Sequence, residues 1–333
     1  MTEIKNIGVI GAGAWGTALA QSACLAGCHT ELWSHEEETA SAINTSAENK
    51  LYLPGIPLDP ALKATTNLEK AASNKDALLM VAPAQFVRSV AQQLVAVTKD
   101  NMPVLICAKG IEIASGKLMS DILAETMPTA IPAILSGPSF AADVARGLPT
   151  AVTLAVQDEE LGHSLAASLS HQALRPYWSD DLIGVQIGGA VKNILAIAAG
   201  IVVGKELGAS AHASLISRGF AEITRFAETF GAKPQTLMGL SGLGDLVLTC
   251  SSPQSRNMSL GIELGKGRTL SEILEQRHSI SEGVHTAKAV AKIAREKNIR
   301  MPISEAVNAI IEGELTTDEA IKTLLSRPLR SEI

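Results

Sequence analysis

The sequence is poor in aromatic residues and in cysteine. Only 3% of its 333 residues are Phe, Trp or Tyr, so the core must be built mainly from Ala, Leu, Ile and Val. The cysteines are Cys24, Cys28, Cys107 and Cys250, and their spacing forms neither a CxxC metal site nor a redox motif. Few, unpatterned cysteines are typical of a reducing cytosol, and we expect a cytoplasmic protein without a metal site.

An excess of positive charge is also absent. The net charge is −6 and the pI about 5.7, which argues against a nucleic-acid partner because phosphate backbones select basic surfaces. A small phosphorylated ligand needs only a few local cations and stays possible. The N-terminal residues lack the basic and apolar regions of a signal peptide, and none is expected.

A glycine-rich segment stands between a short apolar strand, residues 4–10, and a helix expected from Thr17 to Ala26. Its sequence is Gly11-Ala-Gly-Ala-Trp-Gly16, and a second strand is expected at residues 29–33. In this context GxGxxG predicts a dinucleotide site, because the glycines allow a tight turn, close approach of a pyrophosphate and close helix–strand packing. The helix N-terminus adds free N–H groups and a favourable dipole.

The end of the second strand bears on the choice of cofactor. An acid there would bind the ribose 2′-hydroxyl of NAD and repel the 2′-phosphate of NADP. The expected acid position holds Ser34, followed by His35, and Glu36 is expected to lie in the next helix. We therefore expect NADP or NAD to be used, with NADPH slightly favoured.

Strand and helix patterns alternate up to about Asp180, with strands expected at residues 77–81, 103–107, 131–135, 151–156 and 174–178. This alternation predicts a doubly wound parallel α/β sheet of the Rossmann type, whose ligands bind at the carboxyl ends of the strands. Lys109 follows one strand and could meet an anion or a reacting oxygen. After the strand at 131–135, Gly137-Pro138 indicates a turn and Ser139 a helix N-cap.

Strand patterns stop near Asp180, which divides the chain into a dinucleotide-binding domain, 1–180, and an all-helical substrate-binding domain, 181–333. Helices are expected at 182–203, 210–230, 286–296, 303–311 and 317–325, whereas 262–282 suggests loops around a short helix. The segment 182–204 is long enough to span a bilayer, but its glycines and central Lys192 favour a buried helix, and no stable membrane insertion is expected.

Two isolated charges lie in apolar surroundings of the second half. Lys192 is in the middle of an expected helix, and Asp245 is the only charge between Leu237 and Cys250. Because an unpaired buried ion is costly, the two should meet or both face a polar cleft. A desolvated lysine can exchange a proton near neutral pH, as carbonyl reduction requires. A purely structural ion pair is the alternative.

The segment Ser255-Arg256-Asn257 opens another expected helix. A hydroxyl, a guanidinium and an amide at a helix N-terminus suit a phosphomonoester. The alternative is an ordinary N-cap beside a surface arginine.

Taken together, the motifs resemble the bacterial NAD(P)-dependent glycerol-3-phosphate dehydrogenases. The resemblance is carried, in order along the chain, by Gly11-Ala-Gly-Ala-Trp-Gly-Thr-Ala-Leu-Ala20, Ala108-Lys-Gly110, Ser136-Gly-Pro-Ser-Phe-Ala141, Gly188-Gly-Ala-Val-Lys-Asn193, Gly242-Leu-Gly-Asp-Leu246 and Gln254-Ser-Arg-Asn257. It implies reduction of dihydroxyacetone phosphate to sn-glycerol 3-phosphate for phospholipid synthesis, by a cytosolic and often dimeric enzyme.

The resemblance also implies roles for individual residues. Lys192 would donate the proton in reduction and accept it in oxidation. Residues Lys109, Gly137, Ser139 and Asp245 would line the triose site together with Lys192, and Ser255, Arg256 and Asn257 would hold the substrate, chiefly its phosphate. Cofactor contacts would come from Gly11, Gly13, Ala14, Trp15, Gly16, His35, Lys109, Ala141, Arg256 and Glu282, and Asn193 is a further candidate for the site.

Two other functions share parts of this pattern. A reductase of 2-keto or 3-hydroxy acids, such as a ketopantoate-type enzyme, would have the same plan and a catalytic lysine but a carboxylate substrate. A dinucleotide-sensing module without catalysis would have no need of a buried proton donor, so Lys192 and Asp245 argue against it.

Overall fold

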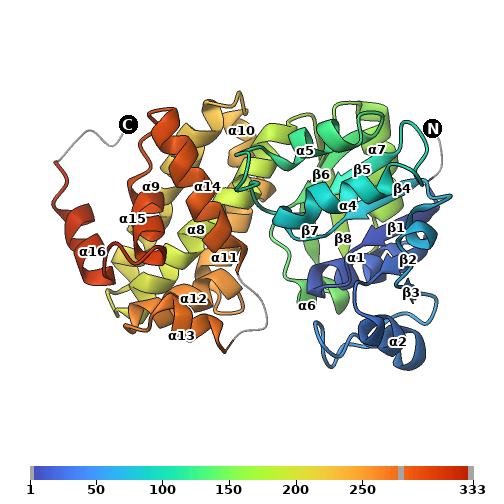
Figure 1. Cartoon of the computed structure of the whole chain (residues 1–333), viewed down its shortest axis with the longest axis horizontal. Coiled ribbons are helices and arrows are strands. Elements are labelled where there is room, and N and C mark those ends of the chain that lie inside the picture. The colour runs from blue at the N-terminus through green and yellow to red at the C-terminus, as the bar shows by residue number, and fades with distance from the viewer. Residues whose placement is uncertain (1–3, 277–280, 329–333) are drawn as a thin grey trace.

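A computed structural model describes residues 4–276 and 281–328 of the chain. A β-sheet flanked by helices forms the N-terminal half, and helices alone form the C-terminal half (Figure 1). The strands are β1 (Asn6–Ile10), β2 (His29–Trp33), β3 (Lys63–Thr65), β4 (Ala77–Met80), β5 (Pro103–Ile106), β6 (Ile131–Ser136), β7 (Thr150–Ala155) and β8 (Leu174–Ser179).

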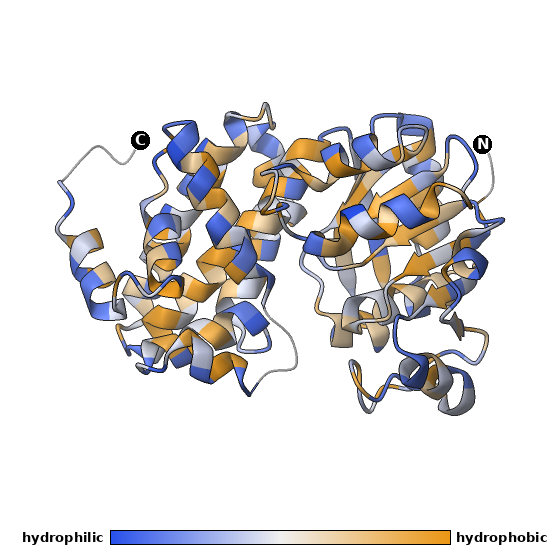
Figure 2. Ribbon diagram, in the orientation of Figure 1, coloured by the Kyte–Doolittle hydropathy of each residue, from blue (hydrophilic) through white to orange (hydrophobic). Residues whose placement is uncertain are grey.

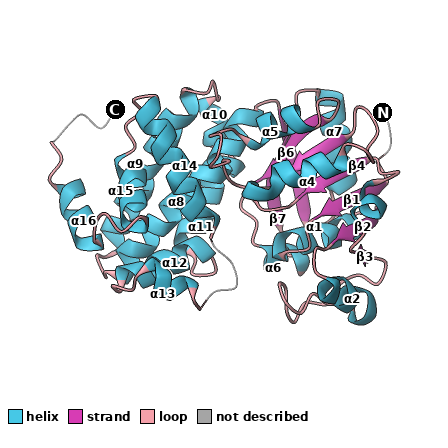
Figure 3. Cartoon of the chain, viewed as in Figure 1, coloured by secondary structure: helices cyan, strands magenta, loops and turns pink. Residues whose placement is uncertain are grey.

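The sheet has the order β3-β2-β1-β4-β5-β6-β7-β8. Strands β1 and β2 lie on one side of the point where the order reverses, between β1 and β4, and β4, β5 and β6 continue on the other (Figure 3). In such sheets the ligand crevice lies at this reversal, outside the carboxyl ends of the strands. The Rossmann-type fold is thus confirmed.

One pairing differs from the expected parallel sheet, since β7 runs antiparallel to β6. The connection between them, residues 137–149, contains only the five-residue helix α6 (Ala141–Ala145). A parallel neighbour is usually reached through a full crossover helix that packs on the sheet, and the five-residue α6 does not supply one. The next strand, β8, is again parallel to β7, because helix α7 (Glu159–Leu169) supplies a full crossover.

The strands lie within a residue or two of their predicted positions, but several small elements were not predicted. These are β3, α3 (Leu68–Ala72), α5 (Met119–Thr126) and α7, whereas α2 (Glu37–Ser46) is the helix expected after β2. After β4 the chain forms the 3-10 turn η1 (Ala84–Phe86) and then α4 (Val87–Leu94). Helix α1 (Ala14–Leu25) begins inside the glycine-rich segment rather than after it.

The C-terminal half is built around α8 (Leu182–Gly204). The other helices are α9 (Ala209–Glu228), α10 (Pro234–Leu237), α11 (Asp245–Ser251), α12 (Arg256–Gly265), α13 (Leu270–Leu274), α14 (Glu282–Glu296), α15 (Pro302–Ile311) and α16 (Thr317–Leu325). Helix α8 has the length and hydropathy of a membrane span, but 89% of that apolar window is buried inside the protein, so α8 is a core helix.

Helices α8 and α12 approach so closely that their backbones are in contact. A Cβ on Gly200 would lie 2.1 Å from the carbonyl oxygen of Met258, and one on Gly261 would lie 2.0 Å from that of Ile197. Glycine is therefore required on both helices, and the contact fixes the start of α12 relative to Lys192, two turns earlier on α8.

Hydrophobic residues gather inside both halves (Figure 2). Separate clusters cover the two faces of the sheet, and a third surrounds α8. As the scarcity of aromatics predicted, these cores are almost entirely aliphatic, with Phe226 an exception in the helical half. The sheet and α8 therefore provide rigid supports for the polar residues at their junction.

Candidate active site

The glycine-rich turn leads from β1 into α1. Gly11 has φ +122°, which disfavours other residues, and a Cβ on Gly16 would lie 1.8 Å from the Gly11 carbonyl oxygen. Both glycines are thus needed for the turn itself.

The N-terminus of α1 has the features of an anion site. Its N-cap is Gly13, which supplies no side-chain cap, and a Cβ on Gly13 would meet no protein atom within 4 Å. The first N–H groups of α1 therefore have no capping side chain, and the backbone at Gly13 is open to the approach of a pyrophosphate. Beside them, Trp15 packs in one cluster with Ala141, and its buried Nε1 has no hydrogen-bond partner in the described part of the chain.

The end of β2 differs from the expectation that Ser34 faces the cofactor. Ser34 is fully buried, and its Oγ donates a hydrogen bond to the Glu36 carbonyl oxygen (2.9 Å) and accepts one from the Glu36 N–H (3.2 Å). Glu36 is the N-cap of α2 rather than part of the helix, and the Tyr52 hydroxyl donates to its carboxylate at 3.1 Å. Of Ser34 and His35, only His35 is exposed.

Lys192 and Asp245 meet, as their isolated charges predicted. Lys192 Nζ donates to Asp245 Oδ1 at 2.6 Å, and both side chains are almost fully buried. Lys109, at the carboxyl end of β5, donates to the other carboxylate oxygen at 2.7 Å. Two lysines from the two halves of the molecule therefore share one carboxylate, and the cluster has a net positive charge.

Thr249, which sequence analysis missed, completes the surroundings of Lys192. Its Oγ1 accepts a hydrogen bond from Lys192 Nζ at 2.7 Å and lies one helical turn after Asp245. The i,i+4 spacing to Asp245 was the available signal. Burial lowers the pKa of Lys192 to about 8, although the Asp245 charge opposes this, so the lysine can give or take a proton near neutral pH.

A turn of π-helix, η2 (Leu240–Gly244), leads directly into α11 and places Asp245 at its first position. This turn packs against α8, where a Cβ on Gly188 would lie 2.7 Å from the Ser241 carbonyl oxygen. Single turns of π-helix often occur at functional sites. Here the close approach brings Asp245 to Lys192, one turn farther along α8.

The segment after β6 adds backbone to the cluster. Lys109 Nζ donates to the Gly137 carbonyl oxygen at 3.1 Å, and the Ser139 hydroxyl donates to the same oxygen at 3.0 Å. Ser139 was predicted as the N-cap of the next helix, and this is wrong: Phe140 holds that position, because Ser139 turns back to Gly137. Ser139 thus lies beside the lysine rather than in a cap.

The start of α12 follows the prediction in part. Ser255 is its N-cap and accepts a hydrogen bond from the Met258 N–H, and Arg256 is exposed. The Asn257 side chain is buried, donates to Asn193 Oδ1 (2.9 Å) and accepts from the Gly283 N–H (3.1 Å). The side chains of Ser255 and Asn257 are therefore already engaged within the protein.

Asn193 and Glu282 connect these segments. Asn193 Nδ2 donates to the Lys109 carbonyl oxygen at 3.1 Å, which joins α8 to the end of β5. Glu282, at the start of α14, accepts a hydrogen bond from the Ala84 N–H after β4 (3.4 Å). Burial raises the pKa of Glu282, and the positive charges of Arg256, Lys109 and Lys192 partly offset this, so the carboxyl lies within their field.

Comparison with known proteins agrees with this site on both sides of the junction. The model of the NAD-dependent glycerol-3-phosphate dehydrogenase N-terminus matches residues 6–162, and that of the C-terminus matches residues 181–322. The chain belongs to this dehydrogenase family.

Relatives named glycerol-3-phosphate dehydrogenase [NAD(P)+] are similar over the full length. The protein of Hyphomonas neptunium is 55% identical over 100% of this chain and 99% of its own, and that of Parvibaculum lavamentivorans 56% over 98% of each. The crystal structure of glycerol-3-phosphate dehydrogenase from Coxiella burnetii has a TM-score of 0.93 at 36% identity and covers 97% of this chain and 99% of that one.

Within this dehydrogenase family plan, the polar cluster lies where the two matched parts meet. Lys109, Gly137 and Ser139 come from the N-terminal part, and Lys192 and Asp245 from the C-terminal part. His35 follows β2, on the other side of β1 from the strands that precede Lys109 and Gly137, and Trp15 lies on α1, so neither belongs to this cluster.

Proposed function

We propose that this chain interconverts dihydroxyacetone phosphate and sn-glycerol 3-phosphate with NAD(P)H. The observation that carries the proposal is Lys192, a buried lysine with a pKa near 8, held 2.6 Å from Asp245 at the carboxyl edge of a dinucleotide-binding sheet. Membership of the dehydrogenase family makes the triose phosphate the substrate favoured over a keto acid.

The residues fit a nicotinamide dinucleotide. Gly11, Gly13 and Gly16 would form the turn for its pyrophosphate, and the N–H groups at Ala14 and Trp15 would bind the phosphates. The further contacts would come from His35, Lys109, Ala141, Arg256 and Glu282. When bound, the cofactor supplies or accepts the hydride.

Use of both NAD and NADP, with NADPH slightly favoured, remains part of the proposal. His35 is exposed where a 2′-phosphate would lie, and the carboxylate of Glu36, which would repel that phosphate, is engaged by Tyr52. The two residues act in opposite directions, so neither cofactor is excluded.

Proton transfer is assigned to Lys192. The protonated ammonium would donate to the carbonyl oxygen during reduction, and the neutral amine would accept the hydroxyl proton during oxidation. Asp245 and Thr249 hold the amine in place, and the positive charge of Lys109 would stabilise an oxyanion at the substrate. Gly137 and Ser139 would line the same space.

The phosphate of the substrate is assigned to the start of α12. Arg256 offers an exposed guanidinium there, and the helix N-terminus adds its dipole. Because Ser255 and Asn257 have engaged side chains, we propose that they contribute backbone N–H groups and hold the helix start rather than bind through their side-chain atoms.

The proposal includes a division into a dinucleotide-binding domain, 1–180, and a substrate-binding domain, 181–333. The gap between β8, which ends at Ser179, and α8, which begins at Leu182, supports this boundary. It also includes a cytoplasmic location, a homodimer, and supply of glycerol 3-phosphate to phospholipid synthesis.

The first experiment follows NADPH consumption on addition of dihydroxyacetone phosphate, and repeats it with NADH and with a panel of 2-keto acids. We expect rapid loss of nicotinamide absorbance with the triose phosphate alone. The ratio of the two cofactors' rates tests the assignment at His35. Consumption with a keto acid but not with the triose would overturn the substrate and leave the fold intact.

Replacing Lys192 with Ala should lower turnover by about 100-fold to 10,000-fold, because a positioned acid or base contributes that much. Binding of the cofactor, measured by fluorescence titration, should be retained, because Lys192 lies outside the glycine-rich turn. An unchanged rate would refute the proton-transfer role.

Replacing Arg256 with Ala should weaken binding of the substrate more than binding of the cofactor. A lost charge-assisted contact to phosphate corresponds to about 10-fold or more in KM. The loss should vanish for dihydroxyacetone, which lacks the phosphate. Equal losses for the two substrates would contradict the phosphate assignment.

A further inference from the structure

A second concave site lies at the far end of the helical half. A cavity of about 340 Å³ is bounded by the end of α14, the connection to α15, the start of α15 and the residue Arg327 that follows α16. Its lining includes three arginines, Arg295, Arg300 and Arg327, and one carboxylate, Glu305. The site is about 20 Å from the active-site end of α14, since α14 runs from Glu282 past Arg295 at 1.5 Å per residue.

The arginines of this cavity lack ion-pair partners. Within residues 4–276 and 281–328, no carboxylate lies within ion-pair distance of Arg295, Arg300 or Arg327. The lining therefore carries a net excess of positive charge, in a chain whose overall charge is −6.

A fourth arginine increases the local positive potential. The guanidinium of Arg225, on α9, donates two hydrogen bonds to the Arg300 carbonyl oxygen, at 3.1 and 3.4 Å. Burial lowers the pKa of Arg225, the Glu222 charge opposes this, and the positive charge of Arg300 lowers the pKa further, so the two guanidiniums repel one another. Bound anions relieve this kind of repulsion.

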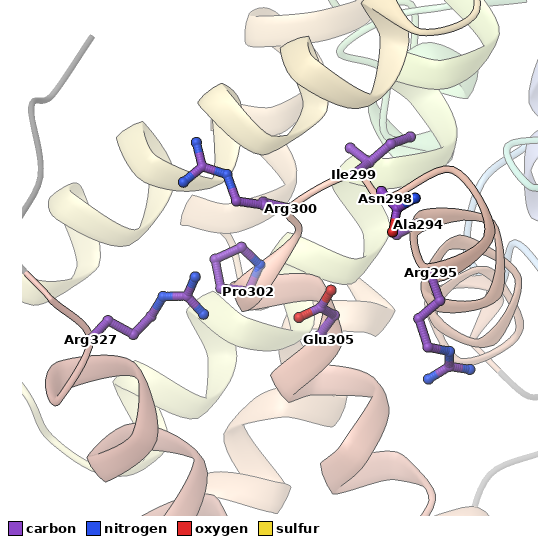
Figure 4. A pocket seen from close by; sticks show the side chains of 8 residues that line it. All are labelled: Ala294, Arg295, Asn298, Ile299, Arg300, Pro302, Glu305 and Arg327. Atoms are coloured by element: carbon purple, nitrogen blue, oxygen red, sulfur yellow. The ribbon is translucent and has the colours of Figure 1, made fainter.

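The side chains that line this cavity lie around Pro302, at the start of α15. Figure 4 shows Arg300 and Arg327 on one side of Pro302 and Glu305 below it, whereas Arg295 is directed away along the rim. The N–H groups of Ile303 and Ser304 at the start of α15 are not available to a ligand, because the buried Glu222 carboxylate accepts from both. An anion here would therefore be bound by guanidiniums rather than by the helix N-terminus.

We propose that Arg300 and Arg327 form a second anion site, separate from the active site, for a small soluble phosphorylated ligand. Guanidiniums match phosphate oxygens in bidentate geometry, and a concave site of this size holds a phosphate or diphosphate group. The Glu305 carboxylate at the edge of the site would repel an extended anionic surface. A compact ligand can bind the arginines while this carboxylate stays in solvent. The anion site itself does not depend on the proposed enzymatic activity, whereas the assignment of the second class of pyrophosphate site to Arg256 does.

Calorimetric titration of the full-length protein with inorganic pyrophosphate tests the site. The unmodified chain should bind pyrophosphate at two classes of site. In the double variant Arg300→Ala/Arg327→Ala, one of these classes should be lost, because its affinity for pyrophosphate should decrease by at least about 10-fold. The class that remains should be the one that Arg256→Ala removes. Turnover of the double variant should equal that of the unmodified chain, because neither arginine lies near Lys192.

A matched control removes the same charge elsewhere. Lys63→Ala/Lys99→Ala takes two exposed lysines from the sheet half and should leave pyrophosphate binding unchanged. If the control variant lost pyrophosphate binding equally, the loss would be explained by net charge alone and the proposal would be overturned. Unchanged pyrophosphate binding by the arginine variant would overturn it as well.

Sedimentation with phosphatidylglycerol vesicles separates the two sources of phosphate. We expect no arginine-dependent retention on the vesicles. Retention that disappears in Arg300→Ala/Arg327→Ala, without any binding of pyrophosphate, would assign the arginines to a membrane surface and overturn the soluble ligand.

Discussion

At the scale of single residues, the Asp245 carboxylate has two positively charged neighbours. Its two carboxylate oxygens accept from Lys192 and from Lys109, so one buried anion holds a lysine from each half of the molecule. Burial alone would lower the pKa of Lys192 further than it does, and the negative charge of Asp245 limits that decrease. Asp245 therefore sets the pH at which the lysine changes charge.

Replacing Asp245 with Asn tests this effect. The reduction rate requires protonated Lys192, so kcat/KM for reduction should fall as the pH rises through about 8 in the unmodified enzyme. Without the carboxylate charge the pKa of Lys192 decreases, and the same fall should move to lower pH by about 1 unit or more. The measurement is the pH profile of kcat/KM with saturating cofactor.

The control for this profile is Asp318→Asn, which removes an exposed carboxylate paired with Lys205. Its pH profile should coincide with that of the unmodified enzyme. If Asp245→Asn lowered the rate without moving the profile, Asp245 would act on substrate binding and not on Lys192.

The sequence predicted the residues whose signal is an isolated charge or a motif. Lys192 and Asp245 stood out because a lone charge in an apolar segment must find a partner, and the structure pairs them. Thr249 was missed because a threonine within a helix is common, and its contact depends on the packing of α11 against α8. Ser139 was misassigned as a cap because its alternative partner, the Gly137 carbonyl oxygen, is visible only in three dimensions.

At the scale of elements, the contact between α8 and α12 determines how precisely the residues of the site are positioned. Replacing Gly200 with Ala would place a methyl group 2.1 Å from the Met258 carbonyl oxygen, so the two helices must separate. We expect a loss of about 2 kcal/mol or more in the free energy of unfolding, measured by urea denaturation.

A matched glycine offers the control. Gly244 has helical dihedrals, and a Cβ there would lie no closer than 3.6 Å to its neighbours, so Gly244→Ala should change stability by only about 0.5 kcal/mol. Similar losses for the two variants would mean that the close approach of α8 and α12 contributes little.

Glu222 links two further elements, α9 and α15. Its buried carboxylate accepts from the N–H groups of Ile303 and Ser304 and from the Ser304 hydroxyl, yet burial outweighs these bonds and raises the pKa of Glu222 to about 7. Between pH 4.5 and 7 the folded chain therefore keeps a proton that the unfolded chain has lost, and stability from this group decreases as the pH rises.

The variant Glu222→Gln should lack this dependence. Relative to the unmodified protein, its free energy of unfolding should increase between pH 4.5 and 8 by up to about 3 kcal/mol, whatever the offset at low pH. The exposed Glu275→Gln should run parallel to the unmodified protein throughout. A constant difference between Glu222→Gln and the unmodified protein would show that folding does not raise the pKa of the Glu222 carboxyl.

Elements with strong local patterns were predictable, and those made by pairing were not. Strand β2 and helix α16 lie where the sequence placed them, since each has a clear period and clear ends. Strand β3 has three residues and exists because it pairs with β2, and the antiparallel direction of β7 accompanies a connection that holds no full crossover helix. Neither fact is encoded in a local pattern.

At the scale of the whole molecule, the sequence predicted a sheet followed by helices and the structure adds how they are joined. The junction is polar: Lys109 to Asp245, Asn193 to the Lys109 carbonyl oxygen, and Glu282 to the Ala84 N–H all cross it. Contacts between segments this far apart in the chain produce no periodic pattern in the sequence. Only the resemblance to family motifs predicted that these residues share one site.

The composition of α8 also matters while the chain is being made. Its 23 residues leave the ribosome after the sheet but before α12 and α14, the helices that later enclose it. During that interval the segment has the length and hydropathy of a membrane anchor and no partner to bury it. A lysine at the middle of such a segment opposes insertion by about 2.5–3.5 kcal/mol. Lys192, which we propose as the proton donor of the enzyme, therefore also disfavours membrane insertion of the newly made helix.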